Sequence, residues 1–175
     1  EDVLHTPQED VLLNNICQTI VNTMGYPLMW IGYARDDKEK TVQPVAKAGL
    51  NTDYVDNLTV TWDDTELGQG PTGRAIRTGK TCFSANIPAD ANFKPWQHSA
   101  LEHGFHSSVA IPLQEDSKVV GTLNIYSAIK EGFAPEEITV LEDLADDIIF
   151  GIHAISQIEK RIKAEEALQK AHDTL

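Results

Sequence analysis

The chain has few of the groups on which covalent cross-linking and nucleic-acid binding depend. Its 175 residues include two cysteines and 14 lysines and arginines, against 27 aspartates and glutamates. The formal net charge is -13, and no basic patch with interleaved aromatic residues offsets it. Nucleic acid and membrane surfaces are themselves negatively charged and would be repelled. We therefore expect neither as a partner.

Long apolar runs are also missing. No stretch approaches the roughly 20 apolar residues that a membrane-spanning helix needs, and no leader-like segment opens the chain. Cys17 lies in a helical pattern and Cys82 in a strand pattern, which favours small buried side chains in a reducing compartment. A cytoplasmic location is expected. Because the chain begins abruptly at Glu1, we expect it to be a piece of a longer protein.

Hydrophobic periodicity predicts one domain of class α+β, with an antiparallel sheet. Strands are expected at residues 28–35, 42–48, 81–87, 107–113 and 119–127. Helices are expected at residues 9–25, 53–58, 67–79, 95–102 and from 135 to the end of the chain. Pro44 indicates an edge position for its strand, and the last two strands form a hairpin around the turn at 115–118.

The last helix carries a heptad-like apolar seam that is too long to be buried on one small domain. The seam consists of Leu141, Leu144, Ile148, Gly151, Ile155, Ile158 and Ile162. A continuation in a phase shifted by one residue consists of Ala164, Leu168, Ala171 and Leu175. Apolar residues at spacings of three and four are typical of a coiled coil, so a partner helix is expected.

The glycine-rich segment 68–73 satisfies the dinucleotide-binding pattern G-x-G-x-x-G. That pattern binds a pyrophosphate only where a buried strand leads into a helix with free N–H groups. Here the acidic residues 63–66 precede the glycines, and Pro71 removes one N–H donor. The segment is therefore interpreted as a turn that begins a helix.

The histidines and cysteines do not form a recognisable metal or catalytic pattern. His98, His103 and His106 do not share a helix face, and no cysteine is near them, so surface histidines are expected. One histidine facing a pocket would still suffice as an axial haem ligand. Cys82 could be a redox thiol, but Lys80 is the only cationic neighbour, so core packing is favoured.

Aromatic residues are the strongest hint of a binding site. Trp30, Trp62, Phe93 and Trp96 exceed what the core of a domain of this size requires, and two of these tryptophans lie in loop-like segments beside aspartates. Such side chains suit a ligand pocket or its lid, although simple packing of a lid on the sheet explains them equally well. No set of nucleophile, base and oxyanion donor is present, so a receptor is favoured over an enzyme.

Taken together, residues 9–158 resemble a GAF domain of a bacterial or archaeal signalling protein. The resemblance rests on W-I-G (30–32), V-x-P-V-A-x-A-G (42–49), L-G-x-G-P-T-G-x-A-I-R-T-G (67–79), D-x-x-F-x-x-W (90–96), S-S-V-A-I-P-L (107–113) and G-x-L-x-I-Y-S (121–127). It implies a twisted antiparallel sheet flanked by helices. The first and last helices would cover one face, and a pocket would lie on the other under loops 50–70 and 88–106.

The resemblance also implies a division of the chain. Residues 1–8 would be an N-terminal extension, 9–158 the sensory domain, and 159–175 a charged coiled-coil linker to a downstream module. A homodimer through the first and last helices is expected. The parent would be a sensor histidine kinase of a two-component system, or a diguanylate cyclase.

Departures from subfamily patterns narrow the expected ligand. Ser127 and Ala128 replace the Asn-Lys pair of cyclic-nucleotide-binding relatives, and residues 88–106 contain no cysteine for a bilin. Free methionine sulfoxide reductases resemble this chain but place a cysteine in the glycine-rich turn, where Thr72 stands here. Haem-binding relatives use a lid histidine, and His103 is the nearest candidate.

We therefore expect a non-catalytic domain that senses an unidentified small molecule, with no cofactor assigned. A ligand-free dimerisation scaffold is the main alternative, and a haem or redox sensor that uses His103 or Cys82 is a third. The residues expected to line the pocket are Trp30, Trp62, Cys82, Phe93, Trp96, His103, Ser108, Asn124 and Tyr126.

Overall fold

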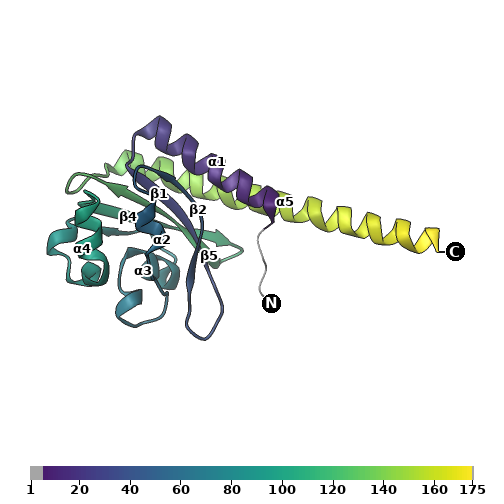
Figure 1. Ribbon diagram of the computed structural model, residues 1–175, viewed down its shortest axis with the longest axis horizontal. Coiled ribbons are helices and arrows are strands. Elements are labelled where there is room, and N and C mark those ends of the chain that lie inside the picture. Colours follow the sequence, from purple (N-terminus) through teal and green to yellow (C-terminus); the bar gives the residue numbers. More distant parts are fainter. Residues whose placement is uncertain (1–5, 175) are drawn as a thin grey trace.

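The computed structural model describes residues 6–174 and shows a sheet of five antiparallel strands in the order β2-β1-β5-β4-β3. The strands are β1 (Leu28–Ala34), β2 (Val42–Gly49), β3 (Cys82–Ser84), β4 (Ser107–Glu115) and β5 (Lys118–Ser127). Helices α1 (Pro7–Met24) and α5 (Pro135–Asp173) lie side by side along one face (Figure 1). The expected α+β fold with a long C-terminal helix is confirmed.

Short elements occupy the opposite face of the sheet. They are α2 (Asp53–Asp56), the 3-10 turn η1 (Glu66–Gly68), α3 (Pro71–Thr78), the 3-10 turns η2 (Ile87–Ala89) and η3 (Ala91–Phe93), and α4 (Lys94–Glu102). In Figure 1 this group lies across the sheet from the two long helices. The domain therefore has three layers, with the sheet in the middle.

Local sequence signals account for the boundaries of most elements. Thr6 caps α1 by accepting a hydrogen bond from the Glu9 N–H, and Gly25 ends that helix in the left-handed conformation. The β4–β5 hairpin turns through Asp116 and Ser117, both at positive φ, as a type I′ turn requires. Pro44 lies on the edge strand β2 beside a bulge, as expected.

One predicted strand is shorter than expected. The pattern predicts residues 81–87, but β3 contains only Cys82–Ser84 and η2 begins at Ile87. The chain leaves the sheet because Pro88 has no N–H to donate and the Ile87 N–H donates instead to the His106 carbonyl. Ile87 is nevertheless fully buried, which explains why it resembles a strand residue in sequence.

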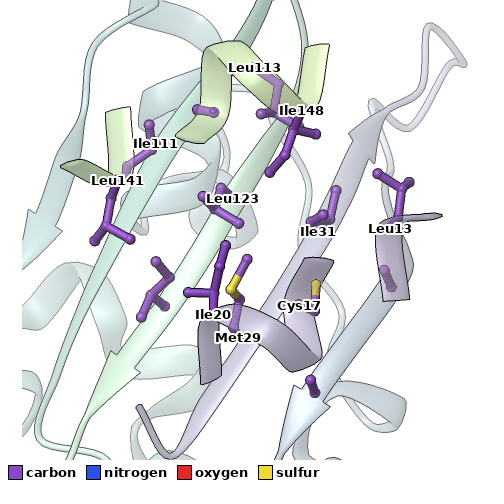
Figure 2. Close-up of a cluster of buried hydrophobic side chains, with 14 of the residues drawn as sticks. Leu13, Cys17, Ile20, Met29, Ile31, Ile111, Leu113, Leu123, Leu141 and Ile148 are labelled. Carbon is purple, nitrogen blue, oxygen red and sulfur yellow. The ribbon is translucent and has the colours of Figure 1, made fainter. Parts of the chain in front are cut away.

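The main hydrophobic core lies between the sheet and the two long helices. Alternating residues of the strands point toward α1 and α5, and aliphatic side chains dominate the contact (Figure 2). Its labelled members are Leu13, Cys17, Ile20, Met29, Ile31, Ile111, Leu113, Leu123, Leu141 and Ile148. Cys17 is fully buried there, as expected, and burial raises its thiol pKa to about 12.

Helix α5 extends well beyond this core. Its buried residues are Leu141, Ala145 and Ile148, whereas Phe150 and Leu168 are about three-quarters exposed at 77% and 74%. Figure 1 shows the C-terminal half of α5 projecting away from the rest of the domain. Among the described residues, no helix is both long and apolar enough to cross a membrane. Residues 1–5 of the predicted N-terminal extension and Leu175 of the predicted seam lie outside the described part of the chain.

Candidate functional site

A small cavity lies between the sheet and the short elements that cover it. Its volume is about 20 Å³, which is close to the space that one water molecule needs. Five aromatic side chains form much of its wall: Trp30, Tyr54, Phe93, Trp96 and Tyr126. The remaining wall residues are Leu58, Val60, Gly70, Pro71 and Thr72. The cavity therefore opens in an aromatic cluster on the face opposite the two long helices.

Sheet geometry explains how these aromatic residues meet. Trp30 on β1 and Tyr126 on β5 point to the same face, and Trp30 Nε1 donates a hydrogen bond of 3.0 Å to the Tyr126 hydroxyl. Tyr54 arrives from α2 and packs edge-on against Tyr126 and Phe105, with ring centroids 5.4 and 5.2 Å apart. Edge-on packing is a favourable arrangement for aromatic rings. Four separate segments thus contribute to one aromatic cluster.

The hydroxyl groups of Tyr54 and Tyr126 lie deep inside the protein. Burial raises the pKa of Tyr126 to about 12, and burial together with the neighbouring Tyr126 raises the pKa of Tyr54 further. The two hydroxyls are near each other, yet no hydrogen bond of ordinary geometry satisfies the Tyr54 hydroxyl. Both hydroxyls therefore stay protonated at physiological pH. They can form hydrogen bonds but cannot act as general bases.

Polar groups on and beside the cavity wall are paired within the protein. Thr72 Oγ1 donates to Asn124 Oδ1 over 2.7 Å, and Asn124 Nδ2 in turn donates to Thr122 Oγ1 over 3.1 Å. Trp96 Nε1 donates to the Thr59 carbonyl over 2.9 Å. Buried polar groups are normally paired in this way, because an unpaired one costs free energy. The first bond joins α3 to β5, the second lies within β5, and the third joins α4 to the segment before η1.

The G-x-G-x-x-G segment leads into α3 at Pro71, as predicted, and its glycines also have packing roles. A Cβ atom on Gly68 would lie 1.8 Å from the Asp63 carbonyl oxygen, and one on Gly73 would lie 2.2 Å from that of Gly68. A Cβ on Gly70 would lie 2.6 Å from the Trp96 ring. Arg77 Nη1 also donates to the Gly68 carbonyl over 2.7 Å. Close backbone approach, and not phosphate binding, therefore explains this pattern.

The structure brings four of the nine expected pocket residues together on the cavity wall: Trp30, Phe93, Trp96 and Tyr126. Asn124 and Ser108 are buried nearby on the sheet but are not part of the wall. The Asn124 side chain is occupied by Thr72, Thr122 and the Trp30 carbonyl. Whether any of these residues contacts a ligand stays a prediction.

Trp62, Cys82 and His103 also lie outside the cavity wall. Trp62 donates its N–H to the Arg35 carbonyl, and Lys40 lies 4.7 Å from its ring centroid, so it closes the end of the β1–β2 hairpin. Cys82 lies on the short edge strand β3, where its thiol contacts the Lys80 carbonyl. The structure thus places these residues away from this cavity, and their contact with a ligand stays a prediction.

His103 is engaged through both ring nitrogens. Nδ1 lies 2.7 Å from the Ser99 carbonyl and Nε2 lies 3.1 Å from Asp53 Oδ2. Both partners are acceptors, so they favour the doubly protonated ring and raise the pKa of His103 above its ordinary value. No ring nitrogen is left for a haem iron, and a cavity of about 20 Å³ cannot hold a porphyrin.

No metal site emerges from the histidines either. His98 pairs with Glu102 on the surface of α4, and the His106 ring lies against the Gly104 carbonyl. Within residues 6–174, no three His, Cys, Asp or Glu side chains gather closely enough to hold a metal ion. His98, His103 and His106 therefore contact different groups and do not form one site.

Sequence reasoning missed six of the ten residues of the cavity wall. Tyr54 and Leu58 lie in the stretch predicted as a short helix, Val60 follows it, and Gly70, Pro71 and Thr72 lie at the predicted helix start. The resemblance did indicate the loop 50–70 as a cover for the pocket. A large aromatic side chain among the polar residues of that loop was the one signal that Tyr54 is buried.

Comparison with known proteins agrees with this architecture. A search of curated proteins finds no match. Among solved structures, a domain from a protein named as a two-component sensor histidine kinase of Sinorhizobium meliloti 1021 covers 95% of this chain and 99% of its own, at 19% identity and a TM-score of 0.61. The GAF domain of a phosphoenolpyruvate-protein phosphotransferase from Coxiella burnetii covers 89% and 88%, at 20% identity and a TM-score of 0.67.

A free methionine-R-sulfoxide reductase from Neisseria meningitidis, solved with its substrate, covers 86% of this chain and 81% of its own, at 18% identity and a TM-score of 0.68. At these identities the likeness shows a shared fold. The family model described as GAF domain matches residues 6–153, which is most of the chain. The chain therefore belongs to the GAF domain family.

Proposed function

We propose that this domain is a non-catalytic sensor that binds a small molecule in the aromatic cavity and relays its occupancy to α5. One observation carries the proposal. Strands β1 and β5 place Trp30 and Tyr126 against the cavity, while the adjacent residues Ile31 and Ile125 pack toward α1 and α5. A movement of Trp30 or Tyr126 would therefore displace the adjacent residue of the same strand, Ile31 or Ile125, and so change the packing of α1 and α5 on the other face.

The receiving element of this relay is a pair of α5 helices in a homodimer. Apolar side chains on α5 remain exposed past the core, and Ile158 and Ile162 of the expected seam are 53% and 42% exposed. Val11 on α1 adds a further exposed apolar group at 60%. Burial of these groups against a second copy would stabilise the dimer, at about 25 cal/mol for each Å² of apolar surface removed from water. A ligand that binds the two helix arrangements unequally would shift their populations.

We place the domain upstream of a signalling output, with a sensor histidine kinase preferred and a diguanylate cyclase as the second choice. The similar domain from a protein named as a sensor histidine kinase supports this order. The similar methionine sulfoxide reductases support an enzyme instead. Against that reading, Cys82 lies outside the cavity wall and Thr72, which lines it, has only a hydroxyl that is already donated to Asn124.

The volume of the cavity favours a second candidate function. At about 20 Å³ the space is filled mainly by the protein's own aromatic rings. A domain whose pocket stays closed would serve only to bring two chains together through α1 and α5. The sensor function requires that the lid segment carrying Phe93 and Trp96 opens. The scaffold function requires no such opening.

Thermal unfolding of the chain with a metabolite library separates the two functions. A ligand at 100 times its dissociation constant stabilises the native state by about 2.7 kcal/mol, which a thermal shift detects readily. The sensor predicts such a shift for at least one compound, together with a changed distance between spin labels on the two α5 helices. A Trp96→Ala variant should lose the response. A stable dimer that responds to no compound supports the scaffold and contradicts the sensor.

A further inference from the structure

One buried hydroxyl of the cavity wall, that of Tyr54, lies beside the Tyr126 hydroxyl without a hydrogen bond of ordinary geometry. Tyr54 is 1% exposed, its ring lines the cavity, and its hydroxyl makes no hydrogen bond of ordinary geometry among the described residues. Leaving a buried hydroxyl unpaired destabilises a protein, so such groups are uncommon and need an explanation. A ligand atom that accepts the Tyr54 proton would supply the missing partner.

The other polar side chains of the wall are already paired within the protein. Trp30 Nε1 donates to Tyr126, Trp96 Nε1 donates to the Thr59 carbonyl, and Thr72 Oγ1 donates to Asn124. The first turn of α3, which begins at Pro71 on the wall, has no side-chain cap among the residues described. An unpaired hydroxyl and an uncapped helix start thus meet at one cavity, and both can donate a hydrogen bond.

The lack of charged side chains on the wall limits which ligands the cavity can bind. The wall carries no ionisable side chain other than two tyrosines, and burial raises the pKa of both. Burying a carboxylate or an ammonium group without a charged partner is costly. The net charge of -13 also repels anions, and the positive end of the α3 dipole opposes a cation. An uncharged molecule meets none of these penalties.

Resting on the sensor function proposed above, we propose that the ligand is a small uncharged molecule with an apolar, preferably aromatic, body and one oxygen that accepts a hydrogen bond from Tyr54. When the lid segment opens, the apolar body packs inside the aromatic wall, which includes Trp30 on the sheet and Phe93 and Trp96 on the lid segment. The oxygen is a ketone, ester or amide carbonyl. Tyr54 therefore selects the ligand by hydrogen bonding, and the aromatic rings select it by shape.

Two probes of nearly equal shape test this selection. Acetophenone has a carbonyl where ethylbenzene has a CH₂ group, and their binding can be followed by the fluorescence of Trp30 and Trp96. The measured quantity is the ratio of their affinities in the wild type and in Tyr54→Phe. We expect the variant to shift this ratio about tenfold toward ethylbenzene, while its melting temperature without ligand stays equal or rises because an unpaired hydroxyl is removed.

Tyr26→Phe is the matched control. The Tyr26 hydroxyl donates to Glu137 on the opposite face of the sheet, so this variant should leave the affinity ratio unchanged. Benzoate and phenyltrimethylammonium test the charge argument, and each should bind at least about tenfold more weakly than acetophenone. The carbonyl stretch of bound acetophenone gives a readout that needs no variant, since it should fall below its value in hydrocarbon solvent.

An unchanged ratio in Tyr54→Phe, an unshifted carbonyl stretch, or tighter binding of either charged probe would overturn the inference. If the four probes fail to bind while a compound from the metabolite library stabilises the protein, the inference is wrong and the sensor function stands. If neither the probes nor the library bind, the sensor function itself is wrong.

Discussion

The two faces of the sheet use the same strands for different purposes. The face toward α1 and α5 is packed almost wholly by aliphatic side chains, and its tyrosines place their hydroxyls at the rim, where Tyr26 donates to Glu137 and Tyr33 to Glu9. The opposite face is aromatic and includes a cavity and an unpaired hydroxyl. Because successive residues of a strand alternate between faces, one stretch of sequence encodes both.

This contrast shows where the domain tolerates imperfect packing. A close-packed aliphatic core stabilises the native state most when nothing in it is unpaired. The aromatic face gives up part of that stability in the Tyr54 hydroxyl and in the residual space beside Trp96. Local departures from optimal packing are typical of functional sites, which supports the aromatic face as the binding face.

The largest expected effect is on the helix side. Leu141 on α5 is fully buried in the aliphatic core, so Leu141→Ala should lower the free energy of unfolding by about 2–5 kcal/mol through lost burial and a residual cavity. Urea unfolding followed by circular dichroism measures the change. The adjacent Val140 is 48% exposed, and Val140→Ala should cost less than about 1 kcal/mol. Similar costs at the two positions would mean that α5 does not dock as described.

A smaller effect is expected on the aromatic side. In Tyr126→Phe the fully buried Trp30 N–H loses its acceptor, so unfolding should become easier by about 1–3 kcal/mol. Tyr54→Phe removes no partner from another group and should be neutral or stabilising. Urea unfolding of both variants gives the comparison directly. Equal losses in the two variants would show that the Tyr54 hydroxyl is paired after all, and would remove the contrast between the two faces.

The sequence was sufficient for the parts of the fold that depend on local patterns. Apolar periodicity predicts α1, β1 and α5, and the turn at 115–118 predicts the hairpin, because these signals lie within a few residues of each other. The cavity wall depends on contacts between distant segments. Tyr54 and Tyr126 are 72 positions apart in the sequence, and no local pattern encodes their contact.

The same limit explains why the sequence does not separate residues of the cavity wall from residues outside it. Trp62 and Trp96 are both tryptophans in segments rich in polar residues, and composition does not distinguish them. The structure separates them because the Trp62 N–H reaches the Arg35 carbonyl, whereas the Trp96 ring lies over Gly70. His103 looked like a free lid histidine for a similar reason, since Asp53 is 50 positions away in sequence. Partners distant in the chain decide which side chains remain available.

The smallest expected effect concerns the pair that joins α2 to α4 beside the cavity. Hydrogen bonds to the Ser99 carbonyl and to Asp53 raise the pKa of His103 above its ordinary value of about 6.5, and the bond to His103 lowers the pKa of Asp53. A histidine whose pKa is raised by folding stabilises the native state fully below its unfolded pKa and loses that contribution as the pH rises through its folded pKa. An aspartate whose pKa is lowered contributes above its unfolded pKa and loses its share in acid. The pair therefore stabilises most between about pH 4 and pH 6.5.

We expect His103→Gln to lower the melting temperature slightly at pH 5.5 and by less at about pH 8.5, because the wild type loses the charged pair at the higher pH. The effect is small because Asp53 is largely exposed, with 65% of its side chain accessible to solvent. Thermal unfolding of both proteins across this pH range measures the difference. Asp53→Asn should remove only part of the pH dependence, because it deletes the charged partner of His103 but leaves the Ser99 carbonyl, the larger cause of the raised pKa, in place. A melting difference that is constant with pH, or that grows toward alkaline pH, would show that the ring does not hold α2 against α4 in its charged form.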